Sequence, residues 1–149
     1  MDITVRHAST GDATLVAHLI HQLLEELGDK ELDVAPYAIT AQKLMDEGEV
    51  QALIAYHGDT PVGLIALNES ASVYAGGKFG TITELYVAPD YRSAGVAPKL
   101  IAAAQDLARL KGWLRFEVGA PDQPRWKRTF EFYIKEGFEE VGPRLRKVF

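Results

Sequence analysis

The chain has 149 residues, the usual size of one globular domain, so we expect residues 1–149 to form a single domain. Its 47% hydrophobic and 25% charged residues are typical of a folded protein with a sizeable core, which excludes a disordered, collagen-like or coiled-coil chain. The 16 basic and 21 acidic side chains leave a net charge of −5, which argues against nucleic acid or an anionic membrane surface as a partner.

The chain contains no cysteine, so disulfide bonds, cysteine-based zinc sites and thiol nucleophiles are excluded. The N-terminal residues lack the basic and then apolar pattern of a secretion signal, and no apolar run approaches the roughly 18 residues of a membrane span. We therefore expect a cytoplasmic protein. His18, His21 and Glu25 have helical spacing on a polar face, a pattern more often found on solvated surface than in a metal site, so we expect no metal.

The first half of the chain predicts a strand, two helices and two more strands, in that order. A strand is expected over Ile3–Arg6, and the helix after it ends at Gly28 because apolar residues recur at helical spacing up to that glycine. A weaker helix is expected over Ala38–Glu47. The apolar runs Val50–Tyr56 and Val62–Leu67 flank a short turn, which predicts neighbouring antiparallel strands. Since both runs are apolar on both faces, we expect a central sheet with helices on each side.

The second half alternates strands and helices. Thr81–Val87 is expected to be a strand after a flexible break at Ala75–Lys78, and a helix begins near Gly95 and ends before Gly112. A strand after this helix implies a right-handed crossover between parallel neighbours. The remaining expected elements are a strand over Trp113–Val118, a helix that opens at Asp122-Gln123-Pro124 and ends before Gly137, and terminal strands over Phe138–Val141 and Leu145–Phe149.

The loop between the strand ending at Val87 and the next helix has the chemistry of a phosphate site. Amides at a helix N-terminus have no intrahelical acceptor, and the helix dipole adds a partial positive charge, so a pyrophosphate is a natural ligand there. The small residues that let phosphates approach are Ser93, Ala94, Gly95 and Ala97. Neither G-x-G-x-x-G nor G-x-x-x-x-G-K-[ST] occurs, so dinucleotide-dependent hydride transfer and ATP hydrolysis have no sequence support.

The run Arg92-Ser93-Ala94-Gly95-Val96-Ala97 resembles the R/Q-x-x-G-x-G/A signature of the GNAT-type N-acetyltransferase superfamily. Thr83–Pro89 precedes this run, and Phe132–Phe138 resembles the F-Y-x-x-x-G-F motif of the same family, so the likeness covers nearly the whole chain. The resemblance implies the acyl-CoA N-acyltransferase fold. In this α/β (α+β) fold, a mixed, mostly antiparallel central sheet contains a parallel splayed pair and is flanked by helices on both faces.

The resemblance also implies that acetyl-coenzyme A is the co-substrate and that no metal takes part. Two positions depart from the pattern: Pro98 has no N–H to donate to a phosphate, and Trp126 stands where the family often has an asparagine. The residues implied to hold the coenzyme are the main-chain amides of Arg92, Ser93, Ala94, Gly95, Val96 and Ala97 at the pyrophosphate, and Leu85, Tyr86 and Val87 along the pantetheine arm.

The reaction implied by the resemblance is direct attack of a primary amine on the acetyl thioester, without a covalent enzyme intermediate. An amine with a pKa near 10.4 is neutral in about one molecule in 2,500 at pH 7, so a base is needed. Glu84, where the family often has an acidic residue, is the candidate base, and strand alternation predicts that it shares a face with Ile82 and Tyr86. Tyr133 matches the family tyrosine that protonates the departing thiolate. The structural alternatives are a solvated strand residue or an ion-pair partner for Glu84, and a core aromatic for Tyr133.

The expected acceptor is a small-molecule amine, such as an amino acid or a polyamine. The alternatives are a non-catalytic acyl-coenzyme A binding or regulatory module and a protein or peptide N-acetyltransferase. Dimers are common among proteins of this family, so a homodimer is one expected assembly, whereas nucleic acid and membrane are not expected partners. An acidic group of residues either selects a cationic amine or serves solubility; its members are Glu25, Glu26, Asp29, Glu31 and Asp33.

Overall fold

The computed structural model of the chain describes residues 1–28, 32–119, 125–142 and 144–149, and its contacts divide the chain into two compact units, Met1–Glu117 and Val118–Phe149. β5 (Phe116–Val118) lies across the boundary of the units, and α4 (Lys127–Lys135) belongs to the smaller one. The elements of the larger unit are β1 (Ile3–His7), the 3-10 turn η1 (Thr10–Asp12), α1 (Ala13–Gly28), α2 (Ala35–Asp46), β2 (Gln51–His57), β3 (Thr60–Ser72), β4 (Gly77–Val87), the 3-10 turn η2 (Pro89–Tyr91) and α3 (Val96–Lys111).

The strands form one sheet in the order β1-β2-β3-β4-β5. The pairs β1–β2, β2–β3 and β3–β4 are antiparallel. β4 and β5 run parallel. The two residues just before β5 already bond to β4: the Leu114 amide donates to the Lys78 carbonyl at 3.1 Å, and the Arg115 carbonyl accepts from the Gly80 amide at 3.0 Å. The mixed, mostly antiparallel sheet expected from the sequence is therefore confirmed, and α3 makes the connection between its parallel neighbours.

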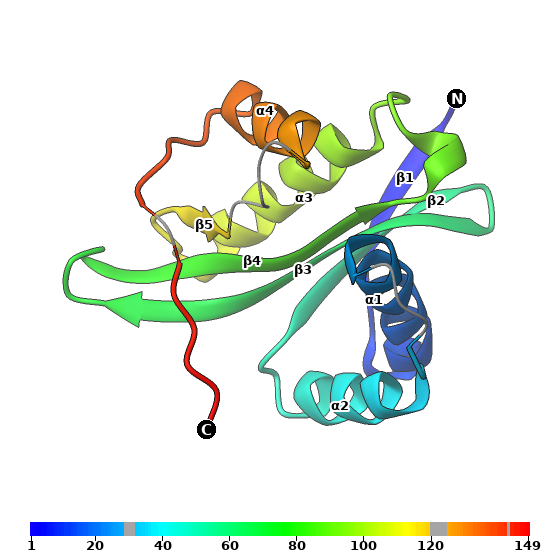
Figure 1. Cartoon of the computed structure of the whole chain (residues 1–149), viewed down its shortest axis with the longest axis horizontal. Helices are drawn as coiled ribbons and strands as arrows, with labels where there is room; N and C mark the ends of the chain where they lie inside the picture. Colours follow the sequence, from blue (N-terminus) through cyan, green and yellow to red (C-terminus); the bar gives the residue numbers. More distant parts are fainter. Residues whose placement is uncertain (29–31, 120–124, 143) are drawn as a thin grey trace. The chain divides into compact units, whose positions relative to one another are not determined.

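Helices cover both faces of the sheet in the larger unit. Figure 1 shows α1 and α2 on one side and α3 on the other. Side chains of α1 and α2 pack with Ile54, Leu64 and Tyr86, which are neighbours across β2, β3 and β4. Because both faces of β2 and β3 are buried, these strands are almost continuously apolar in sequence. The buried residues that α3 contributes are Val96, Leu100, Ile101, Ala104 and Leu107.

Two glycines on the sheet allow close packing on the α3 side. A Cβ at Gly63 would lie 2.9 Å from the Tyr86 carbonyl oxygen and 3.0 Å from Val96 Cγ1, so only glycine fits beside the first residue of α3. A Cβ at Gly80 would lie 2.6 Å from the ring of Trp113. The first glycine fixes where α3 begins, and the second admits the tryptophan that follows the helix.

A β-bulge interrupts β4 at Thr83. Glu84 pairs with Ala66, whereas the next residue of β3, Leu67, pairs with Ile82, so Thr83 is an extra residue without a partner. Glu84 therefore shares the α1 face with Ala66. Ile82 lies with Leu67 on the face that α3 covers. The alternation expected from the sequence is wrong at Ile82, because one inserted residue moves every earlier side chain of the strand to the other face.

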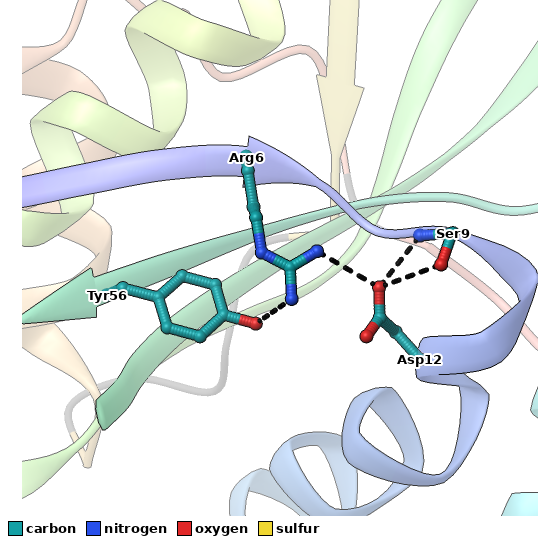
Figure 2. Close-up of polar contacts among 4 residues, drawn as sticks. All are labelled: Arg6, Ser9, Asp12 and Tyr56. Carbon is teal, nitrogen blue, oxygen red and sulfur yellow. Dashed lines mark hydrogen bonds and ion pairs between the residues drawn. The ribbon is translucent and has the colours of Figure 1, made fainter. Parts of the chain in front are cut away.

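A polar cluster joins β1 to the start of α1 (Figure 2). The Asp12 carboxylate accepts hydrogen bonds from the Ser9 amide at 2.9 Å and the Ser9 hydroxyl at 3.1 Å, which caps the first turn. Arg6 donates to the same carboxylate at 3.2 Å and to the Tyr56 hydroxyl on β2 at 2.6 Å. The bond from the Ser9 amide, and then that from Arg6, holds the pKa of the Asp12 carboxyl below its usual value. The cluster fixes where the chain leaves the sheet to enter α1.

The hairpin of β3 and β4 is longer than the sequence predicts. β3 continues to Ser72 and β4 starts at Gly77, so the expected break at Ala75–Lys78 is a turn over residues 73–76. The strand after α3 is shorter than expected because Trp113 precedes it. The indole Nε1 of this tryptophan donates to Glu69 at 2.7 Å, which anchors the side chain on β3 before pairing begins.

The two terminal strands expected over Phe138–Val141 and Leu145–Phe149 are wrong, since neither segment forms a strand. Alternating apolar residues make a strand only where a neighbouring strand edge takes up their backbone bonds and another surface buries one face. Val141, Leu145 and Phe149 are all exposed. Periodicity in the sequence carries no information on whether such a partner is present.

α4 begins at Lys127, with Trp126 as the residue before its first turn. The expected opening of this helix at Asp122-Gln123-Pro124 lies outside the described residues. The helix stops before Gly137, as the sequence predicts, and that glycine has a left-handed φ of 97°.

Candidate active site

The loop between β4 and α3 has two left-handed residues, and we refer to Arg92–Ala97 as the phosphate loop. Ser93 has a φ of 63° and Gly95 a φ of 83°, and α3 begins directly after Gly95. A Cβ on Gly95 would meet nothing within 4 Å, so its φ and not a lack of space favours glycine there. The left-handed conformation costs a residue such as Ser93 about 1–2 kcal/mol, so surrounding contacts must hold it in place.

The amides of the phosphate loop are mostly available to a ligand. The Arg92 amide donates to the Pro89 carbonyl at 3.3 Å, so this predicted phosphate donor already has an acceptor. Within the described residues, the amides from Ser93 to Ala97 donate to no other backbone group. Successive free amides at the start of a helix of 16 residues, together with the dipole of that helix, form a site suited to an anion.

The guanidinium of Arg92 turns back from the loop toward α1. Its Nε donates to the Val87 carbonyl at 3.0 Å, and a terminal nitrogen donates to the Glu26 carboxylate at 2.5 Å. The two side chains are 43% and 30% exposed, so the pair is partly screened from water. Sequence reasoning did not identify this pair, because 66 positions separate its members and no local pattern signals it.

The main chain of β4 presents two of the three predicted pantetheine residues outward. The Ala88 amide donates to the Val62 carbonyl at 2.8 Å, so these two residues form a hydrogen-bonded pair of the antiparallel ladder. Such pairs alternate along the strands, so the next one is Tyr86 with Leu64, and the main chain of Tyr86 bonds to β3. Leu85 and Val87 lie in the pairs between. Their N–H and C=O groups therefore point away from β3, toward the side of β4 on which β5 lies.

Glu84 lies on the α1 face of β4, two residues before Tyr86. Burial raises the pKa of the Glu84 carboxyl above its ordinary value, and a hydrogen bond from the Thr83 hydroxyl lowers it by a smaller amount. Among the described residues, no basic side chain pairs with this carboxylate. A partly buried carboxylate with a raised pKa has the proton affinity that a general base needs.

Tyr133 is the buried residue of α4 in the smaller unit. Its ring centre lies 5.6 Å from that of Phe132 and 5.3 Å from that of Phe138. Burial raises the pKa of the Tyr133 hydroxyl to about 12, so the group stays protonated at neutral pH and can donate a hydrogen bond. Trp126 stacks with Arg125, whose guanidinium carbon lies 5.1 Å from the centre of the indole ring.

Of the three residues named at helical spacing on α1, which are His18, His21 and Glu25, the last two contact the segment between α1 and α2. His21 lies 3.3 Å from Glu25 and contacts the Leu32 carbonyl, and Glu25 accepts a bond from the Leu32 amide at 3.4 Å. In the described ranges, no group of three or more ligating side chains could hold a metal ion. No helix there is long and apolar enough to cross a membrane.

The acidic residues named from the sequence, which either select a cationic amine or serve solubility, are divided among separate contacts. Glu26 pairs with Arg92, whereas Asp33 accepts a backbone hydrogen bond of 3.1 Å at the start of α2. Asp29 and Glu31 lie outside the described residues. The described members of this group therefore have separate structural partners.

Comparison with known proteins agrees with the motifs. Residues 17–132 match the acetyltransferase (GNAT) family. The chain is 30% identical over 144 residues to the aminoalkylphosphonate N-acetyltransferase of Salmonella typhimurium, which covers 96% of this chain and 89% of that protein. It is also 30% identical over 109 residues to the thialysine N-epsilon-acetyltransferase of Caenorhabditis elegans, covering 71% and 68% of the two chains.

Solved structures share the fold. The ribosomal-protein-alanine N-acetyltransferase of Brucella melitensis biovar Abortus 2308 superposes with a TM-score of 0.78 at 20% identity, over 99% of this chain and 100% of that one. The aminoglycoside acetyltransferase meta-AAC0020, from an uncultured soil metagenomic sample, gives 0.83 at 20% identity, over 99% and 96%. Motifs, fold and relatives agree, and the chain belongs to the GNAT family of acetyl-coenzyme A dependent N-acetyltransferases.

Proposed function

We propose that this chain transfers the acetyl group of acetyl-coenzyme A to a primary amine of a small molecule, by direct attack of the amine on the thioester in a ternary complex. The observation that carries the proposal is the phosphate loop. Its free amides stand at the N-terminus of α3, and the strand that leads into it holds Glu84, a carboxylate whose pKa is raised by burial. One strand–loop–helix segment thus supplies both the groups proposed to hold the coenzyme and the proposed base.

Different groups of the chain bind different parts of the coenzyme. Amides from Ser93 to Ala97 bind the pyrophosphate, and Arg92 contributes less because its amide is bonded to Pro89. The outward main chains of Leu85 and Val87 are the groups that hydrogen bond to the pantetheine arm. The Val87 carbonyl already accepts the Arg92 Nε, so the Val87 amide is its freer group.

Glu84 removes a proton from the acceptor ammonium, directly or through a water molecule. At pH 7 the neutral form of an amine with a pKa of 10.4 is disfavoured by roughly 4.6 kcal/mol, and this is the step at which the enzyme gains most. The raised pKa of Glu84 narrows the gap to the amine and so makes the transfer less unfavourable. The free amine then attacks the carbonyl carbon, forming the C–N bond as the C–S bond breaks.

Tyr133 donates a hydrogen bond to the leaving sulfur. A thiol has a pKa near 8.5, so full transfer of a proton from a hydroxyl of pKa about 12 is uphill by about 5 kcal/mol. The hydroxyl therefore stabilises the developing thiolate as a donor, and its contribution is smaller than that of Glu84. Loss of a proton from the attacking nitrogen supplies the proton that the thiolate finally takes up.

The acceptor class is a small primary amine. The two curated relatives are named for an aminoalkylphosphonate and for thialysine, both small molecules that bear an amine. We test the proposal by measuring free thiol released from acetyl-coenzyme A with aminoalkylphosphonates, lysine analogues, polyamines, aminoglycosides and peptides. Release with one class of small amine, strongly reduced in Glu84→Gln, supports the proposal. A protein that binds acetyl-coenzyme A yet releases no thiol above hydrolysis with any of them overturns it, and a preference for peptides moves the acceptor to a protein.

A further inference from the structure

We infer that Glu26 is a positioning residue for coenzyme binding: it holds Arg92, and through Arg92 it sets the shape of the phosphate loop. This inference rests on the proposed function, because it assumes that the loop binds the pyrophosphate of acetyl-coenzyme A. Glu26 belongs to α1, a helix that carries no residue of the family signature. Its role follows only from the contact it makes.

The contact is short and joins three elements. The Glu26 carboxylate accepts from an Arg92 terminal nitrogen at 2.5 Å, while the Nε of the same guanidinium donates to the Val87 carbonyl at 3.0 Å. One planar group thus ties the last turns of α1 to the end of β4 and to the first residue of the loop. Tyr86, on the same strand, lies close enough for both charges to act on its hydroxyl: Arg92 lowers its pKa and Glu26 raises it, each less than burial does.

The loop needs such a restraint. Its backbone holds positive φ values at Ser93 and Gly95, and the amides from Ser93 to Ala97 make no backbone bond in the described chain. It is fixed at one end by α3, where the Lys99 amide donates to the Gly95 carbonyl at 3.3 Å. At the other end the restraints are the Arg92 amide, bonded to Pro89, and the Arg92 side chain. Without Glu26, the guanidinium loses its charged partner and the loop gains freedom that binding must then remove.

The pairing also decides what the positive charge of Arg92 does. Held by Glu26, the guanidinium faces α1 and leaves the diphosphate to main-chain amides and the helix dipole. The alternative is that Glu26 keeps the Arg92 guanidinium from binding phosphate. In that case Glu26→Gln would free the guanidinium and tighten coenzyme A binding, and this outcome would overturn the inference.

The experiment measures coenzyme A affinity by calorimetry for the full chain, Glu26→Gln, Arg92→Gln and the double variant. We expect Glu26→Gln to raise the Kd for coenzyme A about 5- to 20-fold and Arg92→Gln to raise it at least as much. The double variant should match Arg92→Gln, because both substitutions remove the same Glu26–Arg92 contact. The matched control is Asp106→Asn, which removes another carboxylate–guanidinium pair, that of Asp106 with Arg109 at 2.8 Å, and leaves Kd unchanged. Additive effects, or an unchanged Kd in Glu26→Gln, overturn the inference.

A second measurement separates positioning from general damage. Acetyl-pantetheine carries the thioester and the arm but no pyrophosphate, so its kcat/KM should be the same for Glu26→Gln and the parent chain, whereas that of acetyl-coenzyme A falls. An equal fall with both thioesters overturns the inference. Should Glu26→Gln not fold, Glu26→Asp keeps the charge but shortens the reach, and the same selective loss is expected. A parent chain that binds no coenzyme A contradicts the proposed function itself, which is a different result.

Discussion

Glu84 lies directly opposite Ala66 in the β3–β4 pair, next to the bulge at Thr83, and this register places its carboxylate on the sheet face that α1 covers. Without the extra residue, Glu84 and Ile82 would share a face. The bulge instead sends the isoleucine to the α3 side and leaves the carboxylate with small and aromatic neighbours. The consequence is a carboxyl group whose pKa is raised by burial, at the end of the strand that leads to the phosphate loop.

Replacing Glu84 by Gln should lower kcat/KM about 10²- to 10⁴-fold at pH 7, because the amide cannot accept the ammonium proton. The rate of the parent chain should rise with pH as the Glu84 carboxyl deprotonates, and rise again as the free amine becomes abundant. In the variant the first rise should vanish and the second remain. Initial rates of thiol release, measured between pH 5 and 9 for the parent chain and the variant, give the two pH profiles. A variant with both rises intact would show that another group is the base.

The same substitution should make the fold more stable at neutral pH. The folded pKa of Glu84 is raised above its unfolded value, so the folded state binds the proton more tightly, and stability falls as pH rises through the folded pKa. Glu84→Gln carries no charge and avoids this loss. Urea unfolding should therefore give equal stability below pH 4 and a growing advantage for the variant at higher pH. A variant less stable than its parent at pH 8 contradicts the assignment of burial as the cause.

Gly63→Ala and Gly80→Ala should both destabilise the chain by about 1–3 kcal/mol, because each new Cβ meets atoms closer than ordinary contact. Their effects on the coenzyme should differ. Gly63 lies against Val96, the first residue of α3, so its alanine displaces the helix start and raises Kd for coenzyme A several-fold. Gly80 lies against Trp113, which follows the C-terminal end of α3, so Gly80→Ala should leave the Kd for coenzyme A unchanged. Equal effects on binding would indicate a general loss of structure.

Gly95→Ala should cost about 1 kcal/mol of stability and weaken coenzyme A binding, although its Cβ has open space around it. The cause is the left-handed φ of 83°, which an alanine resists. Ser93→Gly relieves the same strain two residues earlier and should leave the fold as stable or more so. Thermal unfolding and calorimetry on both variants check the pair. A harmless Gly95→Ala would mean that the loop changes conformation readily.

Tyr133→Phe should lower kcat less than about tenfold at pH 7, because a thiol with a pKa near 8.5 leaves without full protonation. The ring keeps its packing with Phe132 and Phe138, so the melting temperature should stay close to that of the parent chain. Steady-state rates beside those of Glu84→Gln test the ranking. A loss as large as that of the glutamate variant would make Tyr133 an essential acid.

The order of strands and helices could be predicted because it depends on local chemistry. Apolar spacing predicts α1 and α3, and glycines mark where they end. The bulge at Thr83 could not be predicted, because a one-residue insertion leaves no trace in a pattern of apolar and polar residues. The terminal strands failed for a related reason. Val141 and Leu145 sit in alternating segments, but strand formation depends on a partner far away in the chain.

The candidate site divides along the same line. The residues of the phosphate loop and Glu84 lie in contiguous stretches that resemble a family signature, so they could be named from the sequence. The partner of Arg92 could not, since Glu26 is one of several carboxylates on its helix, and only the folded arrangement selects it. Strand alternation correctly predicted that Glu84 shares a face with Tyr86, but it wrongly placed Ile82 on the same face.

The β3–β4 hairpin has an inner part that β2 also pairs with and an outer part that extends beyond β2. In the described chain, β2 supports β3 only as far as Leu67, whereas β3 and β4 stay paired out to Ser72 and Gly77. The outer stretch is held from the β4 side, where the Leu114 amide donates to the Lys78 carbonyl, and by the Trp113 indole, which donates to Glu69. The β3 amides of this stretch that point away from β4 have no strand beside them within the described residues, so they should exchange with deuterium before those of the inner part. Insertions or tags placed at the tip would then lie at the opposite end of β4 from the phosphate loop.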